Sequence, residues 1–249
     1  MERELDGRVA IVTGAGRNIG RAIARSLADG GAAVIVNTRT NKSEAEAVAG
    51  EIGRQGGKAL PFVGDVTSPD AMRAMAAAAV ERFGRIDILV NNAAVRVEQP
   101  FEEITLEAWR AVTSIIIEGA FNCVQSSLPQ LKRSGAGVII NIGGLSAHTG
   151  AAGRAHVITA KAGLIGFTRA LAHEFAGHKI RVNSVTPGLM ALARPAGQPT
   201  PQHHSFVNTL AGRRGLPEDI AATVRFLCGP GAAYITGQNI QVNGGTYLG

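Results

Sequence analysis

The residues best suited to bind a ligand lie near the start of the chain, in the run Thr13-Gly14-Ala15-Gly16-Arg17-Asn18-Ile19-Gly20. Glycines let the backbone turn tightly and approach a pyrophosphate, and the start of a helix offers aligned N–H donors. The run joins an expected strand to an expected helix, which is the context that a dinucleotide-binding turn requires. The alternative is a tight turn without a ligand. The cofactor contacts predicted here are Gly14, Gly16, Arg17, Asn18, Ile19 and Gly20.

The end of the second expected strand indicates which nicotinamide cofactor would bind. An NAD site places a carboxylate there, which accepts a hydrogen bond from the ribose 2′-hydroxyl. This chain has Asn37-Thr38-Arg39 instead, with no acid. Arg17 and Arg39 could together bind a 2′-phosphate, because guanidinium groups suit that task. We therefore predict NADP(H), with Asn37 and Arg39 among its contacts; the alternative is that both arginines are solvated surface residues.

Strand and helix patterns alternate along the chain and would position these residues. The expected strands are Arg8–Thr13, Ala32–Val36, Lys58–Val63, Ile86–Val90, Val138–Ile142, Ile180–Val185 and Ile240–Val242. The expected helices are Ile19–Ala28, Lys42–Arg54, an alanine-rich helix after Pro69, Leu106–Leu131, Gly153–Ala176 and Pro217–Cys228. The strands are continuous apolar runs, which is typical of parallel strands covered on both faces.

This alternation predicts an α/β fold with a doubly wound parallel sheet of Rossmann type, about seven strands and right-handed crossovers. We find no composition break, so we expect a single domain over residues 1–249. The irregular stretch Leu189–Arg214 is long for a connection inside a compact domain, and we predict that it is a substrate loop or lid.

Composition argues against several functional classes. The net charge is +6, but the basic residues are scattered, which argues against nucleic-acid binding. No apolar stretch is long enough to span a bilayer. The charged start runs directly into a strand, so we expect no signal peptide and a cytoplasmic protein. Cys123 and Cys228 lie in apolar helical patterns and are expected to be buried thiols.

Further motifs resemble, in the same order, those of the short-chain dehydrogenase/reductase family, and more narrowly its 3-oxoacyl-carrier-protein-reductase-like members. Asn18 replaces the middle glycine of the turn. The matching motifs are Asp65-Val66 for the adenine-contacting pair, Asn91-Asn92-Ala93-Ala94 for the Asn-Asn-Ala-Gly motif, Lys161 for the active-site lysine, Asn183, Pro187 and Gly188 after the sixth strand, and 214–220 with 234–238 near the end. The resemblance covers nearly the whole chain and implies that Asp65, Val66, Asn91, Ala93, Lys161, Pro187 and Gly188 contact the cofactor.

The resemblance fails where the family carries out its chemistry. It implies a tyrosine acid, a lysine that lowers the pKa of that tyrosine, a serine on the substrate oxygen and an asparagine that holds a water. The positions that match the tyrosine, serine and asparagine hold Val157, Gly144 and Ile116. Leu192 stands where the family usually has the threonine or serine that holds the nicotinamide amide. None of these side chains can donate a proton or a hydrogen bond. General acid catalysis is commonly worth about 10²–10⁴-fold in rate, so we expect little ordinary carbonyl reduction. The alternative is that these positions are matched to the family out of register. Lys161 and Gly119 argue against this, because they fix the register on the two helices.

Other side chains could replace the lost groups. Ser146 and His148 follow the fifth strand, and a histidine can act as acid or base near neutral pH. Arg154 lies three residues before Val157 and shares its face if the helix has already begun. The candidate catalytic residues are therefore Lys161, His148, Ser146 and Arg154.

The remaining histidines and charged residues allow weaker statements. His156 should point toward packing or a subunit interface, and His203 and His204 could close over a ligand. For each histidine a packing or surface role is the alternative, and their spacing predicts no metal site. Arg96 and Glu98 would line the mouth of the substrate pocket.

Three functions stay open. The first is an enzyme with atypical, even non-redox, chemistry on a small carbonyl-type substrate. The second is a non-catalytic subunit paired with an active family member, and the third, ranked last, is a conventional NADPH-dependent ketoreductase. The helices at 106–131 and 153–176 resemble those with which the family forms dimers and tetramers. The partners expected are thus a small-molecule substrate and further subunits, as a homo-oligomer or as a hetero-oligomer with an active relative.

Overall fold

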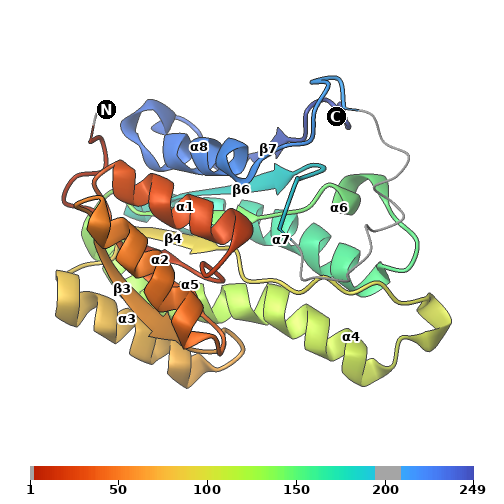
Figure 1. Ribbon diagram of the computed structural model, residues 1–249, viewed down its shortest axis with the longest axis horizontal. Coiled ribbons are helices and arrows are strands. Elements are labelled where there is room, and N and C mark those ends of the chain that lie inside the picture. Colours follow the sequence, from red (N-terminus) through yellow and green to blue (C-terminus); the bar gives the residue numbers. More distant parts are fainter. Residues whose placement is uncertain (1–2, 194–208) are drawn as a thin grey trace.

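The computed structural model describes residues 3–193 and 209–249 (Figure 1). Its centre is a parallel sheet of seven strands in the order β3-β2-β1-β4-β5-β6-β7. The strands are β1 Val9–Val12, β2 Ala33–Thr38, β3 Lys58–Val63, β4 Ile88–Asn91, β5 Val138–Ile142, β6 Arg181–Pro187 and β7 Asn239–Val242. The predicted fold class and strand number are confirmed.

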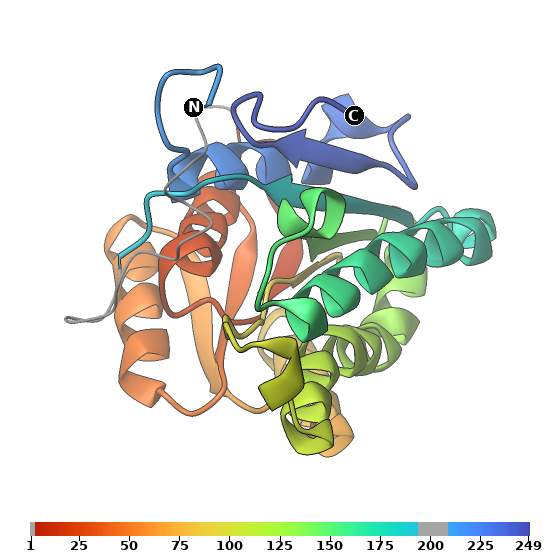
Figure 2. The same cartoon turned by 90° about the vertical axis from the view of Figure 1, so that its right-hand side faces the viewer.

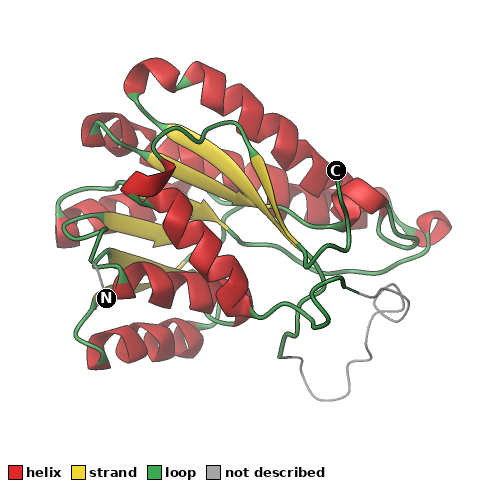
Figure 3. Cartoon of the chain, turned by 90° about the horizontal axis from the view of Figure 1, so that it is seen from above, coloured by secondary structure: helices red, strands yellow, loops and turns green. Residues whose placement is uncertain are grey.

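Helices cover both faces of the sheet (Figures 1 and 3). One layer holds α1 Asn18–Asp29, α2 Lys42–Arg54 and α8 Pro217–Cys228, and the other holds α3 Pro69–Phe83, α5 Gly119–Ser134 and α7 Ala155–Glu174. The shorter segments are α4 Leu106–Thr113, α6 Ser146–Thr149, the 3₁₀ turns η1 Phe101–Glu103, η3 Ala176–His178 and η5 Pro230–Ala232, and the π-helical turn η2 Ser114–Glu118.

The continuous apolar strands bury both of their faces, as the sequence predicted. Along β1, Val12 packs in the core under α1, α2 and α8, whereas Ile11 packs in the core under α3, α5 and α7. Alternation along a strand sends neighbouring side chains to opposite faces, so only a strand that is apolar at every position can fill both cores. Cys123 and Cys228 are buried free thiols, and burial raises the pKa of each to about 12.

Side-chain hydrogen bonds cap the first turns of α2 and α3. Asn41 caps α2 by accepting from the Glu44 amide at 3.1 Å, and Ser68 caps α3 by accepting from the Ala71 amide at 3.2 Å. Such caps satisfy amides that have no partner within the helix. The helix α3 ends at Gly84, whose φ of 84° suits a residue without a side chain.

Two predicted helices have different limits. The expected helix Leu106–Leu131 is divided by the π-helical turn η2 and runs on to Ser134, where Gly135 ends it with a φ of 70°. The expected helix Gly153–Ala176 begins only at Ala155, because Gly153 has a φ of 69° and Arg154 is not helical. The expectation that Arg154 shares a helical face with Val157 is therefore wrong.

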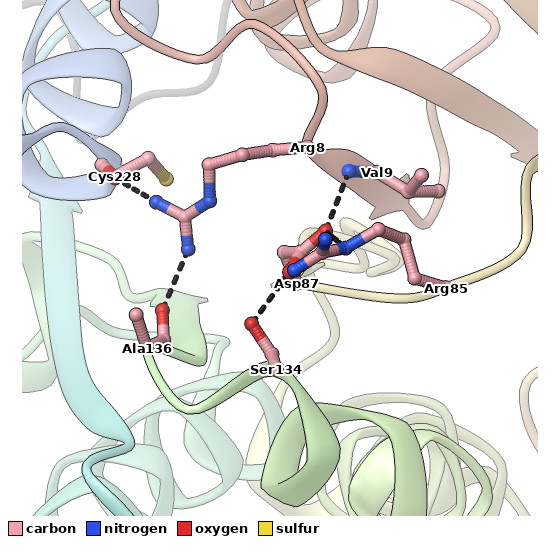
Figure 4. A network of polar contacts seen from close by, with 7 residues as sticks. All are labelled: Arg8, Val9, Arg85, Asp87, Ser134, Ala136 and Cys228. Carbon is pink, nitrogen blue, oxygen red and sulfur yellow. Dashed lines mark hydrogen bonds and ion pairs between the residues drawn. The ribbon is translucent and has the colours of Figure 1, made fainter.

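A buried polar network holds the amino ends of the strands, opposite the glycine-rich turn (Figure 4). The Asp87 carboxylate accepts from the Val9 amide at 2.9 Å, from the Ser134 hydroxyl at 2.5 Å and from the Arg85 guanidinium. Arg8 donates to the carbonyls of Cys228 and Ala136. This network joins β1, β4 and the ends of α5 and α8.

No helix in the described part of the chain is long and apolar enough to cross a membrane.

Candidate functional site

The carboxyl ends of all seven strands meet at one edge, which Figure 2 views directly. The segments after β1, β4 and β5 lie there, together with α6 and the start of α7. The chain order reverses between β1 and β4, since β1 has β2 on one side and β4 on the other. In open α/β sheets, ligands bind in the crevice at such a switch point.

The glycine-rich turn is folded tightly against the end of β4. Gly14 has a φ of 61°, and a Cβ on Gly20 would lie 2.3 Å from the Gly14 carbonyl oxygen, so neither position tolerates a side chain. The side-chain amide of Asn92 donates to the carbonyls of Thr13 and Gly14 at 2.8 and 3.0 Å. In return, the Thr13 hydroxyl accepts from the amides of Asn92 and Ala93, each at 3.0 Å. The sequence analysis did not assign a role to Thr13 or Asn92, although Asn92 lies inside a quoted motif.

The amino end of α1 is open to an anion. Arg17 stands at its cap position, makes no side-chain cap hydrogen bond, and the first turn carries no acidic residue. The starts of α2 and α3, by contrast, are closed by Asn41 and Ser68. Free first-turn amides and the positive end of the helix dipole suit a pyrophosphate. The residues present therefore fit a dinucleotide.

Asn18, which replaces the middle glycine of the turn, links the turn to a segment distant in the sequence. Its φ of 49° is left-handed, a conformation that asparagine tolerates better than most residues. Its side-chain amide donates to the Ala193 carbonyl at 3.2 Å, and its oxygen accepts from the Ala193 amide at 3.1 Å. The segment that follows β6 is thereby bound to the glycine-rich turn, which a glycine at position 18 could not do.

The two arginines predicted to bind a 2′-phosphate are available. Arg17 and Arg39 are both exposed, and neither makes a hydrogen bond or an ion pair within the described part of the chain. Asn37 lies differently: it is buried, donates to the Gly64 carbonyl at 3.0 Å and accepts from the Gly14 amide at 3.4 Å. The structure thus gives Asn37 a part in holding the turn, and its contact with a cofactor stays a prediction.

The other predicted cofactor residues lie on the segments that follow β3 and β6, at the same edge of the sheet. Asp65 accepts from the amide and hydroxyl of Thr67, which shapes the loop after β3. Val66 packs so closely on Gly119 that a Cβ there would lie 2.6 Å from it. A Cβ on Gly188, after Pro187, would lie 2.5 Å from the Asn243 backbone.

A buried chain of side-chain amides lies behind the crevice. The Asn91 amide donates to Asn141 at 2.9 Å, and the Asn141 amide donates to the Thr168 hydroxyl at 2.9 Å. This chain ties the end of β4 to β5 and α7.

Lys161 is a charged group buried at the end of β5. Only 8% of the residue is exposed, and its ammonium donates to the Ile142 carbonyl at 2.5 Å. Burial, reinforced by repulsion from Arg96 and Arg154, lowers its pKa from 10.5 to about 7. An amine with such a pKa can gain or lose a proton near neutral pH.

The surroundings of Lys161 include an apolar cluster and a glycine. Val157, one turn earlier on α7, and Ile116, in η2, are buried in one apolar cluster with Val112, Ala160 and Leu164. Among the residues that the structure describes, a Cβ on Gly144 would meet only the Cγ of Lys161, at 3.8 Å. Gly144 therefore lies directly beside the stem of the lysine.

Charged residues from two segments flank the lysine. The Gln99 amide donates to the Gly153 carbonyl at 2.7 Å, which fixes the segment after β4 beside the start of α7. Burial lowers the pKa of Arg154, and the nearby Glu98 opposes that change. Arg96 and Arg154 are thus near enough to Lys161 to repel its charge, and Glu98 is near enough to Arg154 to attract it.

The remaining candidate residues are placed less favourably for catalysis. The Nε2 atom of His148 lies 2.9 Å from the Asn239 amide nitrogen and 3.1 Å from that of Gln241, and its ring packs on Tyr247. Its burial lowers its pKa. That ring nitrogen is committed to β7, so a catalytic role for His148 stays a prediction. Ser146 is half-buried at the start of α6.

His156 is fully buried, which supports packing over catalysis, whereas His203 and His204 lie outside the described residues. Most of the expected substrate loop lies outside them too. Across 3–193 and 209–249, three or more His, Cys, Asp or Glu side chains do not gather in any group that could hold a metal.

The parallel strand order, with its reversal between β1 and β4, defines a Rossmann-type fold, and the uncapped start of α1 fits a dinucleotide. Comparison with known proteins gives the family. A family model described as enoyl-(acyl carrier protein) reductase matches residues 14–247. The chain belongs to the short-chain dehydrogenase/reductase family, as its motifs indicated.

The relatives cover the whole chain. The 3-oxoacyl-[acyl-carrier-protein] reductase FabG of Vibrio cholerae is 39% identical over 246 residues, which is 98% of this chain and 99% of the relative. The Staphylococcus aureus protein of that name is 38% identical over 240 residues, 96% and 98% of the two chains. The crystal structure of a dehydrogenase/reductase from Sinorhizobium meliloti aligns with a TM-score of 0.92 at 33% identity, over 99% of this chain and 98% of that one.

Proposed function

We propose that this chain is an NADP(H)-dependent reductase of small carbonyl compounds in which Lys161 supplies the proton that a tyrosine supplies in its family. The names of the relatives favour carbonyl reduction, which the sequence analysis ranked last, over non-redox chemistry. The observation that carries the proposal is the buried Lys161 ammonium with a pKa of about 7, which lies beside Gly144, a position without a side chain.

The nucleotide would be held by groups already described. The first-turn amides of α1 suit the pyrophosphate, and the guanidinium groups of Arg17 and Arg39, which have no partner among the described residues, suit a 2′-phosphate. Asp65 and the segment from Pro187 to Gly188 border the adenine and nicotinamide ends. When bound, NADPH supplies a hydride for the carbonyl carbon.

The reduced oxygen also needs a proton, and Lys161 can provide it. One Nζ–H bond breaks, the proton passes to the substrate oxygen, and a neutral amine remains. Burial and the neighbouring Arg96 and Arg154 favour this neutral form, since both effects lower the pKa. Water then returns a proton to the amine. Val157 has no proton to give, and the guanidinium of Arg154 holds its protons too tightly for this task.

The proposal is tested by following NADPH oxidation with small ketones, oxo acids and 3-oxoacyl thioesters. We expect slow but measurable turnover by the native chain and a loss of about 10²-fold or more in Lys161→Met. The matched control is Lys132→Met, which changes an exposed lysine on α5 and should keep the native rate. Equal turnover in Lys161→Met would refute the assigned role, and failure to bind NADPH in a fluorescence titration would refute the cofactor.

One observation favours a second candidate function, a non-catalytic subunit. Val157 and Ile116, at two positions where the family has catalytic groups, are sealed in an apolar cluster. This candidate predicts NADPH binding without turnover of any carbonyl compound. It also predicts that adding an active relative restores turnover above that of the relative alone.

A further inference from the structure

We infer that Glu44 sets the balance between NADPH and NADH, and that this chain binds both cofactors. The Glu44 carboxylate would accept a hydrogen bond from the ribose 2′-hydroxyl of NADH and would repel the 2′-phosphate of NADPH. The inference rests on the proposed function, because it concerns the cofactor site of the proposed reductase.

The first turn of α2, which carries Glu44, is tied to the end of β2. The Thr38 hydroxyl, at the end of β2, donates to the Asn41 carbonyl at 2.8 Å. The Asn41 side chain in turn accepts from the Glu44 amide at 3.1 Å and caps the helix. These two hydrogen bonds fix the position of Glu44 relative to the end of β2.

The side chain of Glu44 lies directly against the glycine-rich turn. A Cβ on Gly16 would lie 2.8 Å from the Oε2 atom of Glu44 and 2.9 Å from its Cβ. Only a residue without a side chain leaves room for the glutamate at this place. Glu44, Gly16, Arg17 and Asn18 also line one hollow of about 590 Å³ between α1, α2 and the start of α8.

The Glu44 carboxylate is available to a ligand, unlike the other acids of α2. Glu46 pairs with Lys42 at 3.6 Å. Glu51 pairs with Arg21 at 2.8 Å. Glu44 is half-buried, and its carboxylate makes no hydrogen bond or ion pair with any residue that the structure describes. Such a carboxylate favours a donor such as a sugar hydroxyl, because its partial desolvation is otherwise not compensated.

Glu44 and Arg17 bring opposite charges to the same hollow. In an NAD site, a carboxylate at the end of the second strand accepts from the ribose 2′-hydroxyl. The strand β2 ends without an acid, and its Asn37 already donates to the Gly64 carbonyl. Glu44 supplies the carboxylate from α2 instead, whereas Arg17 attracts a 2′-phosphate. Because the two charges act in opposite senses, neither cofactor is excluded.

The test uses AMP and 2′,5′-ADP, which differ only in the 2′-phosphate, together with NADH and NADPH. We would measure the four dissociation constants by calorimetry for the native chain and for Glu44→Gln, which keeps the size and removes the charge. We expect the native constants for NADPH and NADH to lie within about 100-fold of each other. In Glu44→Gln, AMP and NADH should bind about 3–10-fold more weakly, and 2′,5′-ADP and NADPH about 3–10-fold more tightly.

Two further variants locate the effect. Glu46→Gln, on an exposed residue of the same helix, is the matched control and should keep all four constants within about twofold of the native values. Glu44→Lys should shift the preference further toward 2′,5′-ADP and NADPH, because it replaces repulsion of the 2′-phosphate by attraction.

Three results would overturn the inference. The first is a native preference for NADPH beyond about 100-fold. The second is a ratio of the NADPH and NADH constants in Glu44→Gln that stays within about twofold of the native ratio. The third is an equal loss of all four ligands in Glu44→Gln.

The same measurements separate this inference from the proposed function. A shifted ratio in Glu44→Gln, without oxidation of NADPH or NADH by any carbonyl compound, would support the role of Glu44 and refute the reductase. Oxidation of NADPH together with an unchanged ratio would support the reductase and refute the role of Glu44.

Discussion

Replacement of Lys161 by methionine should stabilise the protein while it removes turnover. Lys161 is a buried ammonium whose only direct hydrogen bond in the described structure is to the Ile142 carbonyl. Methionine has a similar length and would lie beside Val157 and Leu164, which are already apolar and buried. Removing a buried charge from such surroundings relieves the cost of its desolvation.

The magnitude follows from the pKa. A fall from 10.5 to about 7 corresponds to about 5 kcal/mol of destabilisation when the lysine is protonated, at about 1.4 kcal/mol per pKa unit. Loss of the charged hydrogen bond to Ile142 offsets about 1.5–3 kcal/mol of the gain. We therefore expect Lys161→Met to raise the free energy of unfolding by about 2–3 kcal/mol below pH 7.

The sign with pH distinguishes this cause from better packing. Between about pH 7 and 10.5 the unfolded chain binds a proton at Lys161 that the folded chain has lost, so the stability of the native protein rises with pH there. The advantage of Lys161→Met should be largest below pH 7 and shrink as the pH rises. Urea unfolding at about pH 6 and about pH 9 measures it. A variant that is less stable at the lower pH, or an advantage independent of pH, would refute this reasoning.

Three further predictions concern the nucleotide site and the scaffold. Arg39→Met should weaken NADPH binding by about 10–100-fold and leave NADH binding unchanged, as measured by fluorescence titration. An equal loss of NADPH and NADH binding would refute the assignment of Arg39 to the 2′-phosphate. Asn18→Gly should weaken NADPH binding by about two- to tenfold, because the two hydrogen bonds to Ala193 disappear, and unchanged binding would show that this link is dispensable. Asp87→Ala should lower the free energy of unfolding by about 3–5 kcal/mol in urea, since it leaves the Val9 amide and Arg85 without their buried partner; a loss below about 1 kcal/mol would contradict the network of Figure 4.

Much of the fold could be predicted because its strands are apolar at every position. Continuous runs such as those around Ile11 and Ile140 fit only strands covered on both faces, and the helices between them require parallel pairing. The glycine and cap positions were harder to use for predicting where each helix begins and ends. The π-helical turn at Ser114–Glu118 leaves no periodic signal, and the late start of α7 depends on the left-handed backbone of Gly153.

The site could be predicted only in part, because spacing does not reveal side-chain partners. The glycine-rich turn and Lys161 follow from local patterns, whereas the pairing of Asn18 with Ala193 joins residues 175 positions apart. Asn37, expected at a ligand, also has bonds within the protein that its position in the sequence does not reveal, to Gly64 and Gly14. The segment after β4 is joined to the start of α7 by one backbone hydrogen bond, from Gln99 to Gly153, which no sequence motif predicts.

The pH dependence of kcat/KM for NADPH oxidation, measured with the carbonyl compound that is reduced fastest, tests the role of Lys161 most directly. This constant reports the ionisation of the free enzyme. Because the lysine must carry the proton it donates, kcat/KM should be level below about pH 7 and fall about tenfold per pH unit above it, and Lys161→Met should be slow at every pH. A native profile that stays level to about pH 9, or a Lys161→Met variant with the native rate, would contradict the account.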